Sequence, residues 1–257
     1  MKEKFDKLKQ YLRELDKQGL CLAFSGGIDS CALLYLCKDL NVIAVTFKSI
    51  FQTEQEINEA KEFCNFYGIK QKIIEYYPLE NNLIKNNPKD RCYHCKKLIF
   101  SELKRYAGNK IIIDGTNADD IKTYRPGLKA LKELGIYSPF ADFGITKKEI
   151  IDFSKEGNIK NYAKPSSPCM ATRFPYNTLL NEELIEKAKK GEEIIKNFGF
   201  SNCRFRIHDN IARIEINQEE IEKVIRYRKD ILNKLKALDI KYVTLDLECL
   251  RSGSMDI

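Results

Sequence analysis

A glycine-rich turn between a short apolar strand and a helix constrains this chain more than any other stretch. Residues 20–30 read LCLAFSGGIDS, so an apolar strand leads through Ser-Gly-Gly into a helix whose first turn carries Asp29 and Ser30. Glycines there let the backbone approach a ligand, and the N–H groups at a helix start favour an anion. The spacing matches neither G-x-G-x-x-G nor G-x-x-x-x-G-K-[ST]. The turn therefore indicates either a site for a phosphate or pyrophosphate, or simply a tight strand-to-helix connection.

Ahead of residue 161, apolar runs with strand character alternate with helical patterns. We expect strands at 20–24, 42–47, 70–75, 110–114 and 137–140, and helices at 28–39, 54–67, 92–106, 126–134 and from 146. This alternation predicts an α/β fold, with a parallel sheet wrapped by helices. Ligands of such sheets bind beyond the carboxyl ends of the strands, where the Ser-Gly-Gly turn, Thr46 and the DGTN segment at 114–117 all fall.

The pattern changes after residue 161. The stretch 163–178, AKPSSPCMATRFPYNT, contains three prolines and little periodicity, which is typical of a linker or an ordered loop. Beyond it we expect a helix at 182–197, a β-hairpin at 203–216, a second helix to about residue 238 and a final strand at 242–248. The predicted organisation is a first domain at 1–164, a linker at 165–180 and a small α+β domain at 181–257.

The predicted hairpin has two different faces. Its alternation places Phe205 and Ile207 on one side and Arg204 and Arg206 on the other. A half-buried sheet with one wet side is enough to explain this pattern. A paired Arg-x-Arg can also clamp a phosphate, so the charged face is a candidate anion site as well.

Composition and charge limit the class of protein. A formal net charge of +7 favours anionic partners, which include nucleotides and tRNA alike. The first residues space Phe5, Leu8 and Leu12 along one amphipathic stripe, unlike a signal peptide. No apolar run reaches spanning length, so no membrane partner is expected. Nine cysteines without a secretion signal indicate the reducing cytoplasm rather than a disulfide scaffold.

Two of the cysteines, Cys92 and Cys95, form a C-x-x-C pair at a predicted helix start. This spacing brings two sulfurs together and suits a metal ion, an iron–sulfur cluster or dithiol chemistry. A structural zinc needs four ligands, and the candidates for a second pair are poor. Cys169 lies in the irregular proline-rich stretch. Buried, unreactive thiols are expected in the apolar periodic segments, at Cys21, Cys31, Cys37 and Cys64.

An ordered set of motifs along nearly the whole chain resembles the LarE family of ATP-dependent sulfur transferases. The motifs are SGGIDS, DRCYHCKK, DGTNADD, YRPG, PCMATRFPY and FRIHDNIARIEI. SGGIDS itself is similar to the loop of PP-loop ATP pyrophosphatases, which split ATP between the α and β phosphates and adenylate a substrate. The resemblance implies a PP-loop (HUP-like), doubly wound parallel sheet with a small C-terminal α+β domain. It also implies that a carboxylate of pyridinium-3,5-biscarboxylic acid mononucleotide is adenylated and thiolated, to make the nickel-pincer cofactor of lactate racemase.

The resemblance assigns roles to particular residues. Some family members sacrifice the cysteine at position 169, and others hold a [4Fe-4S] cluster through three cysteines, which here would be Cys92, Cys95 and Cys169. Together with Asp29 these cysteines would be catalytic, and a sulfide donor would load the open iron. ATP with Mg²⁺ would be bound by Ser25, Gly26, Gly27, Asp29, Ser30, Thr46, Asp114, Gly115, Thr116 and Asn117. The nucleotide-like carboxylate substrate would be bound by Arg173, Glu192, Arg204, Arg206 and Glu215. Ring-like oligomers of family members imply a homo-oligomer.

Other functions remain open at the level of the sequence. A tRNA thiolase of the PP-loop class would use three cysteines in the same way, although the chain shows no tRNA-binding module. A PP-loop amidase or ligase would not need the cysteines. A non-catalytic module would bind nucleotide or iron without releasing pyrophosphate. The identity of the sulfur acceptor is not fixed by any motif.

Overall fold

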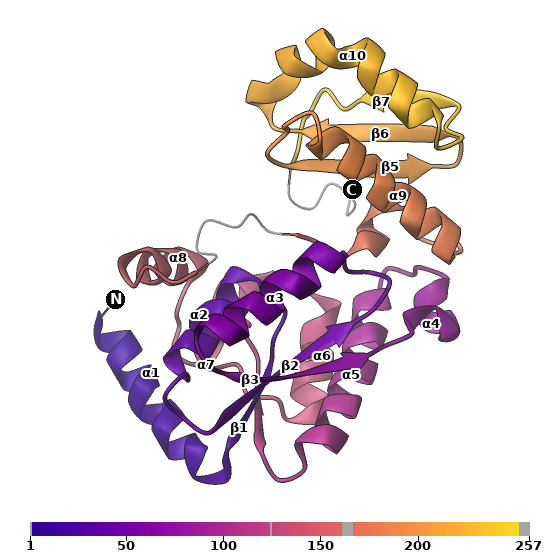
Figure 1. Cartoon of the computed structure of the whole chain (residues 1–257). Helices are drawn as coiled ribbons and strands as arrows, with labels where there is room; N and C mark the ends of the chain where they lie inside the picture. Colours follow the sequence, from indigo (N-terminus) through magenta and orange to yellow (C-terminus); the bar gives the residue numbers. More distant parts are fainter. Residues whose placement is uncertain (1, 124, 161–166, 252–257) are drawn as a thin grey trace. The chain divides into compact units, whose positions relative to one another are not determined.

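The computed structural model describes residues 2–123, 125–160 and 167–251, which form two compact units (Figure 1). The first unit comprises Met1–Pro78 and Asp90–Ser167, and the second comprises Leu79–Lys89 and Pro168–Ile257. The beginning of the predicted linker, at 165–166, lies outside the described residues, as does Tyr124 of the YRPG motif. Within the described ranges no helix is both long and apolar enough to cross a lipid bilayer.

A four-stranded parallel sheet forms the centre of the first unit. Its strands lie in the order β3-β2-β1-β4, and their bounds are β1 (Leu20–Ala23), β2 (Val42–Lys48), β3 (Lys70–Glu75) and β4 (Ile111–Ile113). The central strand β1 pairs with β2 on one side and with β4 on the other. After β1 the chain adds β2 and β3 on one side of it, and then crosses back to place β4 on the other side. Open α/β sheets bind ligands at the point where the strand order reverses in this way. The predicted PP-loop α/β fold is confirmed.

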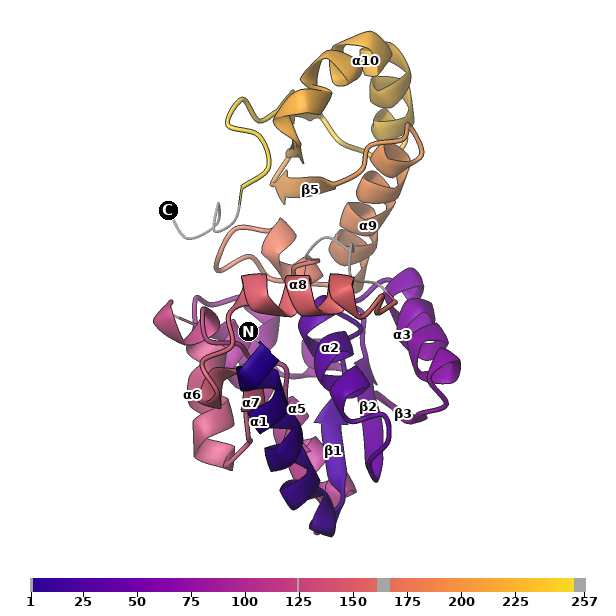
Figure 2. The same ribbon diagram turned by 90° about the vertical axis from the view of Figure 1, so that its left-hand side faces the viewer.

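Helices cover both faces of this sheet. They are α1 (Lys2–Leu15), α2 (Ile28–Leu36), α3 (Glu54–Phe66), α5 (Arg91–Ala107), α6 (Pro126–Leu134), α7 (Pro139–Asp142) and α8 (Lys147–Glu156). Side chains of β1 alternate between two cores: Leu20 and Leu22 pack with α1, α2 and α8, whereas Cys21 packs with α5 and α6. Figure 2 shows α1 and α8 on the near side of the unit. Both faces are buried, as a parallel sheet requires.

One predicted strand is wrong. The stretch 137–140 does not form a strand, because only Tyr137 makes a parallel bridge to Ile113 before the chain turns into helix α7. Pro139 stands at the start of that helix. Proline has no N–H to donate to a sheet ladder, and its fixed φ suits the first turn of a helix.

A capping box fixes where α8 begins. The Thr146 hydroxyl accepts from the backbone N–H of Glu149, and the Glu149 carboxylate accepts from the backbone N–H of Thr146. This reciprocal pair satisfies N–H groups that a helix start otherwise leaves without partners. Lys147 is therefore the first residue of the helix.

The second unit contains a small mixed sheet and its own helices, as predicted for a C-terminal α+β domain. Strands β5 (Cys203–His208) and β6 (Ile211–Ile216) form an antiparallel hairpin, and β7 (Tyr242–Leu245) pairs in parallel with β6. The helices are α4 (Asn82–Lys85), α9 (Glu182–Lys196) and α10 (Ile221–Lys236). A segment distant in sequence joins this unit, because the N–H of Asn177 donates to the carbonyl of Asn87.

The hairpin is largely buried on both faces, which contradicts the wet side, one of the two interpretations that the alternation left open. On the apolar face, Phe205 lies against Gly191 of α9, and a Cβ added at Gly191 would come within 2.2 Å of the Phe205 ring. On the charged face, Arg206 is only 1% exposed. The alternation in the sequence separates the two faces correctly, but it cannot show that other segments cover the charged one.

The contact between α9 and the hairpin generates the first prediction. Gly191→Ala would raise helix propensity, but its methyl group would collide with Phe205. We expect a net destabilisation of about 1–3 kcal/mol, measured by urea unfolding of the full chain. Lys190→Ala, at an exposed position of the same helix, is the control and should change stability by less than about 0.5 kcal/mol. Equal stabilities of the two variants would contradict the packing argument.

Candidate functional site

The Ser-Gly-Gly turn is a tight loop that presents the start of α2. Gly26 has φ +73°, and a Cβ there would meet the Ala60 Cβ at 3.2 Å, so both conformation and space favour glycine. The Ser30 hydroxyl donates to the carbonyl of Gly27 at 2.9 Å and lies 3.2 Å from the Ser25 hydroxyl. These bonds hold the loop so that the first N–H groups of α2 can face an anion.

The loop after β4 lies directly against the first turn of α2. A Cβ added at Gly115 would come within 3.0 Å of the Ser30 backbone nitrogen. The two sequence segments predicted to bind nucleotide are therefore neighbours in space, and glycine is what permits their close approach.

The polar side chains of this second loop bond to the loop itself. The Asp114 carboxylate accepts from the hydroxyls of Thr116 and Ser138, each at 2.6 Å. The Asn117 side-chain oxygen accepts from the backbone N–H of Asp119 at 2.9 Å. The side chains of Asp114 and Asn117 thus shape the loop. Ser138 was not anticipated, since nothing in its sequence neighbourhood points to Asp114.

Thr46, near the carboxyl end of β2, is buried and bonded to Phe24, which follows β1, and to Gln71 of β3. Its hydroxyl donates to the carbonyl of Phe24 at 2.9 Å and accepts from the side chain of Gln71. This arrangement ties the carboxyl end of β2 to the residue that leads into the Ser-Gly-Gly turn.

Asp29 has a cationic partner that the sequence did not reveal. Its Oδ2 accepts from the Lys147 ammonium at 2.6 Å, whereas its Oδ1 is buried without a hydrogen-bond partner among the described residues. Burial raises the pKa of Asp29, and Lys147 counteracts part of that rise. The nearby Asp120 carboxylate adds to the rise in pKa, and the Asn117 side chain opposes it. No motif could have identified Lys147, because the two residues meet only through the packing of α8 beside α2.

Cys92 and Cys95 stand in the first turns of α5, and each sulfur has a nearby donor. The Arg91 guanidinium lies 3.6 Å from the Cys92 Sγ, and the Tyr76 hydroxyl lies 3.7 Å from the Cys95 Sγ. Both sulfurs therefore lie within reach of a hydrogen-bond donor, and neither is buried. This pair can therefore act as ligand or nucleophile, and Arg91 and Tyr76 are additions to the predicted site.

The nine cysteines fall into two groups by accessibility. Cys92 and Cys169 are exposed and Cys95 is half-exposed, while the other six are buried. Burial raises the pKa of the Cys37 thiol to about 12, and it does the same at Cys64. The expected inert cysteines, Cys21, Cys31, Cys37 and Cys64, are indeed buried.

The C-x-x-C pair belongs to the first unit and Cys169 to the second. Cys169 caps a short 3-10 turn, Met170–Arg173, and its carbonyl accepts from the N–H and the hydroxyl of Thr172. Among the residues that the structure describes, no three His, Cys, Asp or Glu side chains gather closely enough to hold a metal ion. The three-cysteine site therefore stays a prediction.

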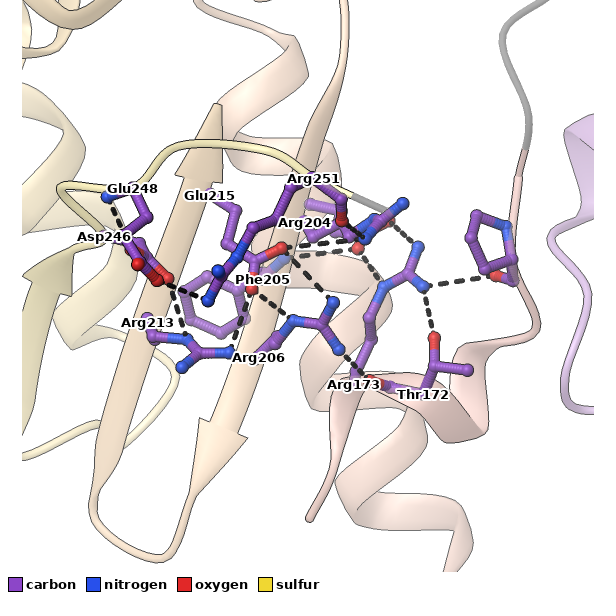
Figure 3. Close-up of polar contacts among 12 residues, drawn as sticks. Thr172, Arg173, Arg204, Phe205, Arg206, Arg213, Glu215, Asp246, Glu248 and Arg251 are labelled. Atoms are coloured by element: carbon purple, nitrogen blue, oxygen red, sulfur yellow. Dashed lines mark hydrogen bonds and ion pairs between the residues drawn. The ribbon is translucent and has the colours of Figure 1, made fainter. Parts of the chain in front are cut away.

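In the second unit, arginines and glutamates form a buried network (Figure 3). Arg206 makes a two-pronged ion pair with Glu215, at 2.5 and 3.2 Å. Arg173 does the same with Glu192, at 2.5 and 3.3 Å. These two ion pairs contain four of the five predicted substrate residues: Arg173, Glu192, Arg206 and Glu215.

Arg204 is the fifth member of that set and differs from the others. Its guanidinium donates to the carbonyl of Arg251 at 2.9 Å, and its distance to the Glu215 carboxylate is 3.8 Å. Burial lowers the pKa of Arg204, and the charges of Arg206 and Arg173 lower it further. Arg213 also contacts the Glu215 carboxylate, at 3.0 Å, and lies 3.4 Å from the Asp246 carboxylate. Four guanidiniums thus share three carboxylates, which leaves one positive charge in excess in the network around Arg204.

Comparisons with known proteins agree with this architecture. The NAD synthase family model matches residues 1–97, which include the Ser-Gly-Gly loop. Over 97% of the chain and 98% of the relative, the chain is 36% identical to an uncharacterised protein of Methanocaldococcus jannaschii. An uncharacterised protein of Synechocystis is 31% identical over the whole chain. The pyridinium-3,5-bisthiocarboxylic acid mononucleotide synthase of Lactiplantibacillus plantarum is 34% identical over 94% of the chain and 90% of its own length. The chain therefore belongs to the LarE family of PP-loop ATP-dependent sulfurtransferases.

Proposed function

We propose that this enzyme adenylates a carboxylate of pyridinium-3,5-biscarboxylic acid mononucleotide, releases pyrophosphate and replaces an oxygen with sulfur. The name of the Lactiplantibacillus relative supports the substrate class. The observation that carries the sulfur chemistry is the selective accessibility of the cysteines: only Cys92, Cys95 and Cys169 are not buried. These are the three positions that a cluster-bearing family member would use.

The nucleotide would bind at the paired loops of the first unit. The helix start after Gly27 provides backbone N–H donors for phosphates, and Gly115 lets the second loop approach them. Asp29 fits a Mg²⁺ ligand, because its buried Oδ1 lacks a hydrogen-bond partner within the described ranges. When bound, Mg²⁺ would offset phosphate charge while the substrate carboxylate attacks the α-phosphorus.

Cys92, Cys95 and Cys169 would hold a [4Fe-4S] cluster. Two accessible sulfurs in one helical turn, each with a donor at 3.6–3.7 Å, are a donor set that suits such a cluster. Bound there, it would supply an iron without a protein ligand, at which sulfide from a donor can be held for attack on the acyl-adenylate. Such chemistry suits the reducing cytoplasm, where we place the enzyme.

The substrate phosphate would bind at Arg204. Arg173 and Arg206 already have carboxylate partners, so Glu192 and Glu215 would hold these two arginines in position around the bound anion. An added anion would relieve the positive excess that now surrounds Arg204. We also propose that the enzyme acts as a homo-oligomer.

The cysteine assignment is tested by Cys92→Ala, Cys95→Ala and Cys169→Ala. After anaerobic reconstitution, each variant should hold far less iron than the roughly four atoms per chain expected of the parent. Each should also lose repeated sulfur transfer. Iron content and thiolated product, measured together, check both statements.

Cys64→Ala is the matched control, because this buried thiol has a pKa of about 12 and should not bind iron. Parent-like iron content and turnover in Cys92→Ala or Cys95→Ala would contradict the cluster. Conversion of Cys169 to dehydroalanine after a single turnover, seen by mass spectrometry, would show that this cysteine is consumed instead. Sulfur transfer to tRNA but not to the pyridinium substrate would identify a tRNA thiolase.

The role of Arg204 is separated from that of Arg206 by a pair of variants. Arg204→Gln should weaken binding of the phosphate-bearing substrate by about tenfold or more, because a charged hydrogen-bond donor is lost, with little change in melting temperature. Arg206→Gln should instead destabilise the fold by about 3–5 kcal/mol, because Glu215 would stay buried without its main partner.

Calorimetric titration with the substrate and thermal unfolding measure the two effects. Arg226→Gln removes the same charge from an exposed site of α10 and should change neither. If Arg204→Gln melts like Arg206→Gln and binds the substrate like the parent, Arg204 is a structural residue and the assignment fails.

A further inference from the structure

The ion pair between Asp29 and Lys147 lies at the place where the nucleotide phosphates would sit. Asp29 belongs to the first turn of α2, beside the Ser-Gly-Gly loop. Its Oδ2 is 2.6 Å from the Lys147 Nζ, and its Oδ1 is buried without a hydrogen-bond partner in the described part of the chain. A carboxylate that has one oxygen paired and one oxygen open can accept a second cation.

The backbone and the side chain of Lys147 are held independently. Its backbone N–H donates to the Asp119 carboxylate at 2.9 Å, and the capping box of Thr146 and Glu149 fixes the start of α8 around it. The Lys147 side chain is 38% exposed, and its ammonium is held through Asp29. The ammonium can therefore leave Asp29 by rotation of side-chain bonds, while α8 stays in place.

The Lys147 ammonium is paired with the Asp29 carboxylate, to which a divalent ion would have to bind. Lysine carries a compact charge on a flexible stem and binds phosphate as a point charge. A divalent cation on Asp29 would repel the ammonium, whereas nearby phosphate oxygens would attract it. A move of the ammonium from Asp29 to a phosphate oxygen would therefore relieve its repulsion by the divalent cation and form a new ion pair.

We propose that Lys147 is an exchangeable cation, which neutralises Asp29 in the nucleotide-free enzyme and moves to an ATP phosphate oxygen when Mg²⁺ binds Asp29. The inference rests on the proposed ATP site and deepens it by naming a phosphate ligand from α8. In this scheme Lys147 is a catalytic residue, because its ammonium touches the substrate. A permanently structural ion pair would instead keep its partner throughout the reaction.

The two schemes differ in how Lys147→Gln affects metal and nucleotide binding. With the competing ammonium gone, nucleotide-free Lys147→Gln should bind Mn²⁺, as a probe for Mg²⁺, several-fold more tightly than the parent. The same variant should bind ATP with Mg²⁺ about tenfold to a hundredfold more weakly, because a charged contact to phosphate is lost. Electron paramagnetic resonance of free Mn²⁺ and calorimetric titration of ATP measure these opposite shifts.

Two further variants complete the experiment. Lys148→Gln removes the same charge from the next, exposed residue of α8 and should bind Mn²⁺ and ATP like the parent. Lys147→Arg keeps the charge and should retain ATP affinity to within a few-fold. Thermal unfolding should show that all three variants are folded, since the pair is partly solvated.

Unchanged Mn²⁺ affinity or unchanged ATP affinity in Lys147→Gln would overturn the exchange. The result is separable from the proposed function, because neither measurement uses the pyridinium substrate. A parent enzyme that fails to bind ATP with Mg²⁺ would refute the nucleotide site itself. A parent that binds ATP but does not thiolate the pyridinium compound would refute only the proposed acceptor.

Discussion

The close contact between Gly115 and the first turn of α2 determines how near the loops after β1 and β4 come to each other. A side chain at Gly115 would reach within 3.0 Å of the Ser30 nitrogen and push apart the loops that follow β1 and β4. Because the contact exists, Asp29 lies close to both loops and within reach of α8. The hydrogen bonds of Asp114, Thr116 and Asn117 keep their own loop in the shape that makes this approach possible.

The second unit meets a different constraint, because it buries charge on one face of its hairpin. Burying an ion pair brings little net stability, since desolvation offsets the attraction, but the pairing fixes the position of each group. Arg173 with Glu192 and Arg206 with Glu215 are held this way. Each pair is neutral as a whole, so the charge of Arg204 itself stays in excess, which is why we propose it as the group that binds an incoming anion. The network therefore fixes the positions of the groups that we propose as a phosphate site and contributes little to the stability of the core.

Cysteine chemistry in this chain is governed by burial and by local donors. The chain has nine cysteines, but only Cys92, Cys95 and Cys169 are accessible to solvent. Burial raises the thiol pKa at positions such as Cys37 and keeps those sulfurs protonated. At the C-x-x-C pair, Arg91 and Tyr76 each place a hydrogen-bond donor near a sulfur that is not buried. The chain therefore contains both buried thiols that stay protonated and accessible thiols near hydrogen-bond donors.

The sequence by itself determined the local features: the parallel α/β pattern, the Ser-Gly-Gly turn, the helix that starts near residue 146, the hairpin and the burial of cysteines in apolar segments. These depend on periodicity and on turn chemistry within a few residues. It misjudged residues 137–140, where Pro139 prevents a strand. It left open whether water or other segments cover the charged face of the hairpin. Only the tertiary structure brought Lys147 to Asp29, Ser138 to Asp114 and Tyr76 to Cys95. Such partners are far apart in the chain and meet because helices and strands pack, a relationship that no local pattern of residues encodes.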